Sequence, residues 1–494
     1  MTAHAGDAKP AVMLDLRPVG YVIGLLTATL GVLMLFPMAL DLAAGSRNWA
    51  AFAESAALTF VCGLLLALAC ANGTGSGLDL RQSFVLTTGV WIVLPAFGAL
   101  PLMLGAPGVG LTDAMFESMS GMTTTGTTVL TGLDSLPLGA NLWRAMLQWL
   151  GGLGIVVVAL IFLPVMKVGG MQFFRAEGFD TLGKVLPRAL DISSALVQIY
   201  VLITLGCAAT FWLLGMDGYE AVIHALSAVS TGGFSNRDTS FTEFSDALHY
   251  AAVVFMILST LPFIRFIQLM QGHPLPMWQD GQVRAYLRWT LYAIGAIIAW
   301  RVLANGEPLL HTLHDSVFNV VSIFSGTGYG SGDVLLWGHM PFVVLLIVGL
   351  IGGCTSSTGC SVKVFRYLVM FQAIRTQIRR ILMPFSVQPV RLDGRTVEED
   401  VINSVIVFFA MFVLSFGLLA VALSMAGLPP RTALTAAWTS IADIGPVWGP
   451  MVGPTGAVDA FPTSAKWLLI AGMLVGRLEL LSVYVLFTVR FWSR

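Results

Sequence analysis

Long apolar segments recur along the whole chain, and they constrain its fold more than any other feature. They lie near residues 20–42, 50–72, 83–104, 143–165, 192–215, 247–270, 287–304, 340–370, 402–426 and 465–490. Crossing a bilayer takes roughly 17–25 residues of helix. Backbone polar groups cannot stay unpaired in lipid, so these runs predict about ten transmembrane helices. A transmembrane barrel is the alternative, but its strands would be short and would alternate in polarity.

The composition agrees with a chain that is mostly surrounded by lipid. Hydrophobic residues make up 56% of it and charged residues only 11%, about half the charged fraction of an average soluble domain. The net charge of −1 gives no overall attraction to nucleic acid, and we expect no such partner. The five cysteines lie in or beside apolar stretches without metal-like spacing, so we interpret them as small buried apolar residues.

Positive residues in the connecting segments predict the orientation of the chain. They gather in 166–190, in 363–395 and at the end of the chain, as Lys167, Arg175, Lys184, Arg188, Lys363, Arg366, Arg375, Arg379, Arg380, Arg391, Arg395, Arg490 and Arg494. Such segments stay in the cytoplasm, and an even number of spans places both termini there. Arg375, Arg379 and Arg380 suit anionic lipid headgroups or an acidic partner surface.

Four connections between spans are too short and too apolar to be ordinary loops. Aligned on one glycine they read SGMTTTG (120–126), SAVSTGG (227–233), SIFSGTG (322–328) and TSIADIG (439–445). Each predicts a short helix that enters the membrane and then turns at glycine. Re-entrant backbone is tolerated only where it is buried or lines a cavity. Small residues that merely let helices pack are the alternative for any one segment, but not for four in matching positions.

The repeat predicts an all-α polytopic membrane protein with four span–pore loop–span units around a pseudo-fourfold pore. Two extra transmembrane helices precede the units. We place the boundaries at 1–75 for this extension and at 76–170, 171–275, 276–385 and 386–494 for pore units 1 to 4, the third with a broken second helix.

The repeated segments suit a cation, because a dehydrated K⁺ needs several oxygens to replace its water. Backbone carbonyls supply them where the chain is extended, and glycine reaches the required dihedral angles without strain. Thr327-Gly328-Tyr329-Gly330 resembles a K⁺-channel filter. We expect K⁺ at these filter residues: Thr124, Thr125, Gly126, Thr231, Gly232, Gly233, Thr327, Gly328, Tyr329, Ile444 and Gly445.

These motifs resemble the Trk/Ktr/HKT superfamily of K⁺ transporters, and the Trk membrane subunit in particular. The resemblance covers nearly the whole chain and also rests on Asp443-Ile444-Gly445-Pro446 and Gly476-Arg477-Leu478-Glu479. It implies K⁺ as the transported ion, since relatives with serine at the first filter glycine tend to carry Na⁺. It also implies the bacterial inner membrane, no covalent cofactor, a homodimer, and a cytosolic ring of nucleotide-binding regulatory subunits of the Trk A type.

Asp443 departs from the family pattern, in which an uncharged polar residue is expected two positions before the fourth glycine. One interpretation is that its charge adds negative potential at the mouth of the filter. The other is that it caps a helix or pairs locally.

The span at 340–370 is interrupted at mid-membrane. Glycines and small hydroxyl residues break the helix there: Gly352, Gly353, Cys354, Thr355, Ser356, Ser357, Thr358, Gly359 and Cys360. Irregular backbone at this depth must face protein or a cavity. The resemblance implies a loop under the filter that blocks the pore and moves to open it. A kink sealed by neighbouring helices is the alternative.

Arg477 lies near the middle of the last span, where an unpaired charge is costly. Glu479 is two residues away, on another helix face, so a pair within the helix is not expected. The resemblance implies that Arg477 faces the pore and acts as an electrostatic barrier to K⁺. Snorkelling to an interface or an ion pair with another helix are the alternatives.

The leading functional hypothesis is K⁺ uptake. An Na⁺-coupled or less selective monovalent-cation secondary transporter is the alternative, and it would share the interrupted span. An enzyme is not expected, because HExxH and GxSxG are absent. GxxxxGK[ST] is absent too, so nucleotide control would need another chain.

Overall fold

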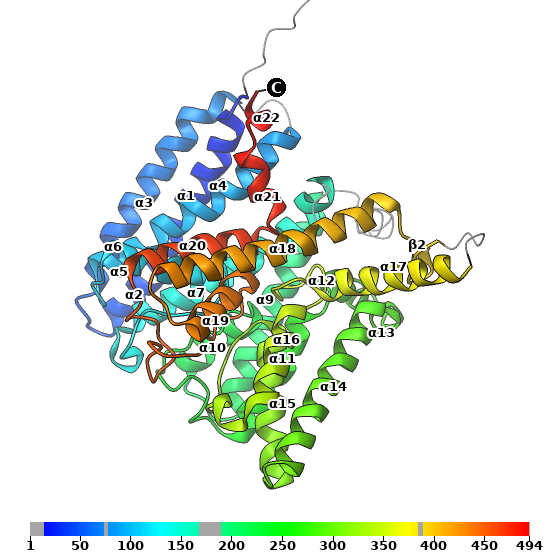
Figure 1. The fold of residues 1–494 in the computed structure, drawn as a ribbon. Helices are drawn as coiled ribbons and strands as arrows, with labels where there is room; N and C mark the ends of the chain where they lie inside the picture. The colour runs from blue at the N-terminus through cyan, green and yellow to red at the C-terminus, as the bar shows by residue number, and fades with distance from the viewer. Residues whose placement is uncertain (1–13, 74–77, 167–188, 384–388, 494) are drawn as a thin grey trace, which may run out of the picture.

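A computed structural model describes residues 14–73, 78–166, 189–383 and 389–493. Its chain forms the helical bundle of Figure 1. Within these ranges the strands are β1 (Arg391–Leu392) and β2 (Arg395–Thr396), which pair antiparallel. The all-α prediction is therefore confirmed. Some of the residues that we used for orientation lie outside the described ranges: Lys167, Arg175, Lys184, Arg188 and Arg494.

Helices or helix pairs lie at all ten predicted spans. They are α1 (Arg17–Leu33) with α2 (Leu35–Ala43), α3 (Trp49–Cys70), α4 (Leu80–Gly98) with α5 (Leu100–Leu104), α7 (Leu138–Met166), α9 (Ala189–Leu213), α11 (Asp246–Thr260) with α12 (Phe263–Met270), α14 (Gly281–Leu303), α16 (His339–Ile351) with α17 (Val364–Leu382), α18 (Glu399–Met425), and α20 (Thr463–Arg477) with α21 (Leu481–Tyr484). By length and composition, five of the described helices are suited to cross a membrane, or seven if two bent pairs count. The short α16 and the arginine-rich α14 do not meet that test.

Four short helices sit between the spans, one in each predicted unit. They are α6 (Leu111–Met122), α10 (Gly218–Val229), α15 (Leu309–Ser325) and α19 (Pro430–Ala442), and we call them the pore helices. The remaining elements are α13 (Leu275–Gln279), α22 (Val489–Trp492) and the 3₁₀ turns η1 (Ala71–Gly73), η2 (Leu133–Ser135), η4 (Val334–Trp337) and η5 (Val485–Phe487). Each pore helix ends a few residues before its filter glycine.

Two spans are sharply bent. Helices α11 and α12 meet at 95°, where Pro262 cannot continue the backbone hydrogen bonds. Helices α20 and α21 meet at 105°, after Glu479 and Leu480 adopt left-handed backbone angles. The sequence predicted one continuous span over 465–490, and the bend at residues 478–480 corrects this. Its physical reason is that Glu479 turns out of the helix to meet Arg366 of α17.

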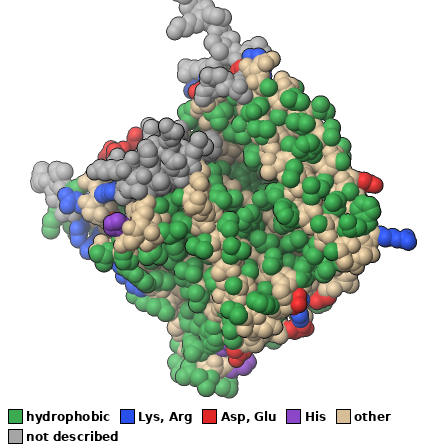
Figure 2. Space-filling view, turned by 180° about the vertical axis from the view of Figure 1, so that it is seen from behind, with side chains coloured by type: hydrophobic (Ala, Val, Ile, Leu, Met, Phe, Trp, Pro, Cys, Tyr) green, Lys and Arg blue, Asp and Glu red, His purple; other side chains and the backbone are tan. Residues whose placement is uncertain are grey.

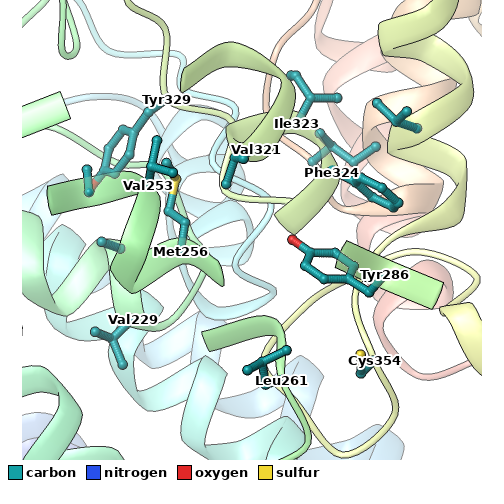
Figure 3. Packing of buried hydrophobic residues seen from close by; sticks show 14 of the residues in the cluster. Val229, Val253, Met256, Leu261, Tyr286, Val321, Ile323, Phe324, Tyr329 and Cys354 are labelled. Atoms are coloured by element: carbon teal, nitrogen blue, oxygen red, sulfur yellow. The ribbon is translucent and has the colours of Figure 1, made fainter. Parts of the chain in front are cut away.

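The outer surface of the bundle is apolar. Figure 2 shows hydrophobic side chains over most of one face, with charged side chains gathered toward its edges. This pattern fits a surface that lies against lipid tails. The largest core cluster packs around the third pore helix: Figure 3 shows Val321, Ile323 and Phe324 of α15 facing side chains of neighbouring elements such as Met256 and Tyr286.

Candidate ion pathway

The four pore helices end with the same backbone geometry. In each repeat, the residue before the filter glycine donates its N–H to the carbonyl of the hydroxyl residue five positions earlier. The pairs are Thr125 to Ser120 at 2.9 Å, Gly232 to Ser227 at 2.8 Å, Thr327 to Ser322 at 2.9 Å and Ile444 to Thr439 at 3.2 Å. Two positions before the glycine the backbone is left-handed in every repeat, with φ of 55° at Thr124, 53° at Thr231, 81° at Gly326 and 51° at Asp443. The same backbone turn therefore follows each of the four pore helices, although the residues that form it differ.

The four filter glycines interlock in a closed ring. A Cβ atom built on any of them would press on the carbonyl oxygen that precedes the next glycine: Gly126 on Gly232, Gly233 on Thr327, Gly328 on Ile444 and Gly445 on Thr125. All four glycines have positive φ, between 80° and 110°. Only glycine combines this backbone angle with so close an approach. The filter segments of all four repeats therefore meet around one centre.

The side chain of Asp443 joins the fourth repeat to the first. Its Oδ1 accepts a hydrogen bond of 2.7 Å from the Thr125 hydroxyl, and the Thr127 hydroxyl donates to the Gly445 carbonyl at 2.6 Å. Asp443 is also the C-cap residue of α19. At that position its backbone N–H bonds to the Thr439 carbonyl, while its side chain pairs with another repeat. Its carboxyl group also lines the same small cavity as Arg477.

Helix α7 supports the second filter segment from behind. Gln148 donates to the Gly232 carbonyl at 2.6 Å and accepts from the Ser227 hydroxyl at 2.6 Å and from the Phe234 N–H at 3.0 Å. Each of these partners lies about one repeat further along the chain. Gln148 was not among the predicted site residues, although a polar residue inside an apolar span was the available signal.

A buried ion pair supports the first filter segment. Arg144, one turn before Gln148 on α7, contacts Glu117 of α6 at 2.7 Å, and both side chains are fully buried. Glu117 also accepts hydrogen bonds from Thr128 and Val129, while Arg144 donates to the Ser235 carbonyl at 2.9 Å. The pair therefore links the chain after the first filter glycine to the chain after the second. Arg144 was missed from the sequence for the same reason as Gln148.

The side chain of Tyr329 packs among aromatic rings. Its ring centroid lies 4.5 Å from that of Phe241, and its hydroxyl donates to the Phe234 carbonyl at 3.3 Å. The Tyr329 carbonyl accepts from the Ser322 hydroxyl at 2.7 Å. Tyrosine thus anchors the third filter segment through its ring.

The interruption between α16 and α17 is a buried loop directly beside the filter. The predicted gate residues Gly352, Gly353, Cys354, Thr355, Ser356, Ser357, Thr358 and Gly359 are all buried. The Thr358 carbonyl accepts from the Thr231 hydroxyl at 3.1 Å, and Cys360 lies 3.6 Å from the Thr124 hydroxyl. The loop therefore touches the filter segments of repeats 1 and 2 at their left-handed residues.

The bend between α11 and α12 holds this loop. The Thr358 hydroxyl donates to the Ser259 carbonyl at 2.9 Å, and the Cys354 N–H donates to the Thr260 carbonyl at 3.0 Å. The Phe263 N–H in turn donates to the Ser356 carbonyl at 2.9 Å. Backbone groups left unpaired by the broken span of repeat 2 are thus satisfied by the broken span of repeat 3.

Arg477 reaches the loop from α20. The residue is 4% exposed, and Nη1 donates to the Cys360 sulfur at 2.8 Å. Within the described residues, its Nε and Nη2 have no hydrogen-bond acceptor. Asp443 lines the same cavity as Arg477, and Trp91 lies 5.8 Å from the guanidinium. Arg477 and the loop are therefore neighbours next to the filter.

Glu479 takes no part in pairing with Arg477. It contacts Arg366 and lies 3.7 Å from Lys363, and all three side chains are buried. Lys363 and Arg366 follow the loop, so this cluster ties its far end to the break in the last span. The expectation that Glu479 would not pair within its own helix agrees with this arrangement.

Three comparisons relate the chain to known proteins. The TrkH family, described as cation transport protein, matches residues 49–286 and 306–493. The Trk system potassium uptake protein TrkI of Halomonas elongata is 40% identical over 84% of this chain and 84% of its own length. The TrkH protein of Escherichia coli K12 is 33% identical over 96% of this chain and 99% of its own. The crystal structure of the potassium transporter TrkH from Vibrio parahaemolyticus aligns with a TM-score of 0.89 at 30% identity, over 97% of this chain and all of that one.

Proposed function

This chain belongs to the TrkH family of cation transport proteins, which are transporters and not enzymes, and we propose that it takes up K⁺ through its ring of four filter segments. The names of its relatives as potassium uptake proteins support the choice of ion. The observation that carries the proposal is the interlocked ring of glycines and carbonyls. Carbonyl oxygens from four sides can replace the water of a K⁺ ion.

Gly126→Ser tests the selectivity of the ring. A serine there presses on the Gly232 carbonyl and takes up a strained backbone angle. Overpacking costs about 1–3 kcal/mol. We expect the displaced carbonyl to weaken K⁺ binding by a comparable free energy, so the ratio of K⁺ to Na⁺ flux should fall roughly 5- to 150-fold. The measurement is tracer flux into liposomes that hold the purified protein.

Gly110→Ser is the matched control in the same repeat. Gly110 is the N-cap of α6 and has open space around its Cα, so serine fits there and suits a helix cap. Its flux ratio should equal that of the wild type. Equal K⁺ and Na⁺ flux in the wild type would contradict the proposed selectivity and favour the less selective transporter.

We further propose that the loop at residues 352–360 and Arg477 form the gate. The loop's contacts with Thr124 and Thr231 support a position in the ion path, and the sulfur of Cys360 links it to Arg477. Two nitrogens of the guanidinium have no acceptor in the part of the chain that the structure describes, and its positive charge would repel a cation that leaves the filter. Moving the loop away would carry Cys360 from Arg477 and open the path.

We also propose a homodimer in the bacterial inner membrane, with both termini in the cytoplasm and a cytosolic ring of nucleotide-binding subunits as partner. The exposed arginines at the end of α17 support a cytoplasmic contact with acidic groups: Arg375, Arg379 and Arg380. Light scattering of the purified protein in detergent should give the mass of two chains, and a monomer mass would contradict the dimer.

Replacing the three arginines with glutamate should abolish co-purification of a regulatory subunit, and unchanged co-purification would contradict the contact.

A further inference from the structure

Two histidines and an aspartate converge at the end of the molecule where the third pore helix begins. His249 and Asp246 lie in the first turn of α11, and His314 lies in the second turn of α15. These two helices run side by side in Figure 1. His249 Nδ1 is 3.1 Å from His314 Nε2, and that nitrogen is 3.6 Å from Asp246 Oδ1. The ligand atoms of the three side chains all lie within 4.8 Å of one another.

The hydrogen bond from His249 to a backbone carbonyl directs its other ring nitrogen, as a lone pair, toward His314. His249 Nε2 lies 2.7 Å from the Phe241 carbonyl, which can only accept, so Nε2 carries the proton and Nδ1 has the lone pair. His314 lies between two carboxylates, with Asp315 3.5 Å from Nδ1 and Asp246 3.6 Å from Nε2. Its Nε2 can therefore donate a proton to His249 Nδ1, and a metal ion that displaces this proton would meet both nitrogens and Asp246. Carbonyl and carboxylate partners of this kind orient metal-binding histidines in general.

The distances fit a small transition-metal ion. Zn–N bonds of about 2.0–2.1 Å place two ligands of a tetrahedral ion roughly 3.3 Å apart, close to the 3.1 Å between the imidazole nitrogens. Two imidazoles and one carboxylate select Zn²⁺ and similar ions over Mg²⁺ or Ca²⁺. Asp246 is 82% exposed, so the site is open to solvent and water can fill a fourth position.

We propose that Asp246, His249 and His314 bind a divalent transition-metal ion such as Zn²⁺, which clamps α11 of the second unit to α15 of the third. The clamp is connected to the filter. The Phe241 carbonyl holds His249, and the Phe241 N–H donates to the carbonyl of Gly330, two residues after the third filter glycine, at 3.1 Å. The bound ion braces the rim of the third filter segment.

Zn²⁺ binding to the full chain tests the site. The protein is purified in detergent without a histidine tag and titrated with ZnCl₂, and CoCl₂ reports geometry through its visible absorption. We expect one Zn²⁺ per chain, an absorption typical of tetrahedral Co²⁺, and affinity at least roughly tenfold weaker in His249→Gln and His314→Gln.

Two further variants keep the result interpretable if a buried histidine variant folds poorly. Asp246→Asn changes an exposed side chain and should also weaken Zn²⁺ binding, whereas His339→Gln, at an exposed position at the start of α16, should not. Zn²⁺ should raise the thermal unfolding temperature of the wild type and of His339→Gln at concentrations about tenfold lower than those needed for the other three variants. Failure of the wild type to bind Zn²⁺, or equal binding by all four variants, would overturn the site and leave a proton shared between the rings.

Discussion

Removing the charge of Glu117, which forms a buried ion pair with Arg144, should strongly lower the stability of the protein. Glu117→Gln leaves the Arg144 charge without its partner in a site where both side chains are fully buried. Breaking a buried pair in this way costs about 3–5 kcal/mol. We therefore expect a clear fall in the thermal unfolding temperature of the purified protein.

An exposed pair supplies the control for that experiment. Glu243→Gln removes a contact with Arg237 in which the Glu243 side chain is 55% exposed. Exposed pairs contribute about 0–1 kcal/mol, so this variant should unfold near the wild-type temperature. Equal shifts in the two variants would show that the buried pair does not stabilise the region behind the filter.

Replacing Arg477 should change the K⁺ flux. Arg477→Ala removes a buried positive charge that lies next to the proposed gate loop. One such charge a few Å away contributes about 4 kcal/mol at an effective dielectric constant of 20, so K⁺ flux should rise at least roughly tenfold. Arg490→Ala, at an exposed position near the end of the chain, should leave flux unchanged. Wild-type flux in Arg477→Ala at normal expression would count against the barrier.

At the scale of elements, the loop that we propose as the gate contains one threonine whose hydroxyl is hydrogen-bonded within the described part of the chain and one whose hydroxyl is not. The Thr358 hydroxyl bonds to the Ser259 carbonyl, whereas the buried Thr355 hydroxyl has no partner among the described residues. Thr358→Val removes a bond worth about 1 kcal/mol, which should loosen the loop and raise K⁺ flux about fivefold. Thr355→Val removes no hydrogen bond among the described residues, so its K⁺ flux should equal that of the wild type. Flux that is the same in both variants would mean that these contacts do not hold the loop closed.

The filter turns and the broken third unit were predictable because their signals are local. A glycine with a hydroxyl six residues before it recurs between spans, and a run of small residues interrupts one apolar segment. The supports behind the filter were not predictable in this way. Gln148 meets its partners 79 to 86 residues further along the chain, a pairing set by the packing of α7 against α10. The break of the last span at Glu479 was not predicted for a similar reason, because its partner Arg366 is 113 residues away.

The orientation of the whole molecule can be tested by labelling introduced cysteines. Thr239 lies in the exposed segment after the second filter, and Gln377 lies on the exposed side of α17. The positive residues around α17 predict that it lies in the cytoplasm. In cells, an impermeant maleimide should label Thr239→Cys directly and Gln377→Cys only after permeabilisation.

The background for this labelling is favourable. Cys207, Cys354 and Cys360 are buried, so replacing the two partly exposed cysteines, Cys62 and Cys70, with alanine leaves little native reactivity. The reverse labelling pattern would invert the proposed topology.

The bond between Thr125 and Asp443 spans 318 residues, and it closes the ring between the first unit and the last. During synthesis, this bond can form only after the fourth unit has been made. A chain that stops before Pro430 lacks both the last pore helix, α19, and the carbonyl of Ile444 that Gly328 approaches. We therefore expect that such truncated chains do not form the proposed K⁺ pathway, so that an incomplete product would not leak ions across the membrane.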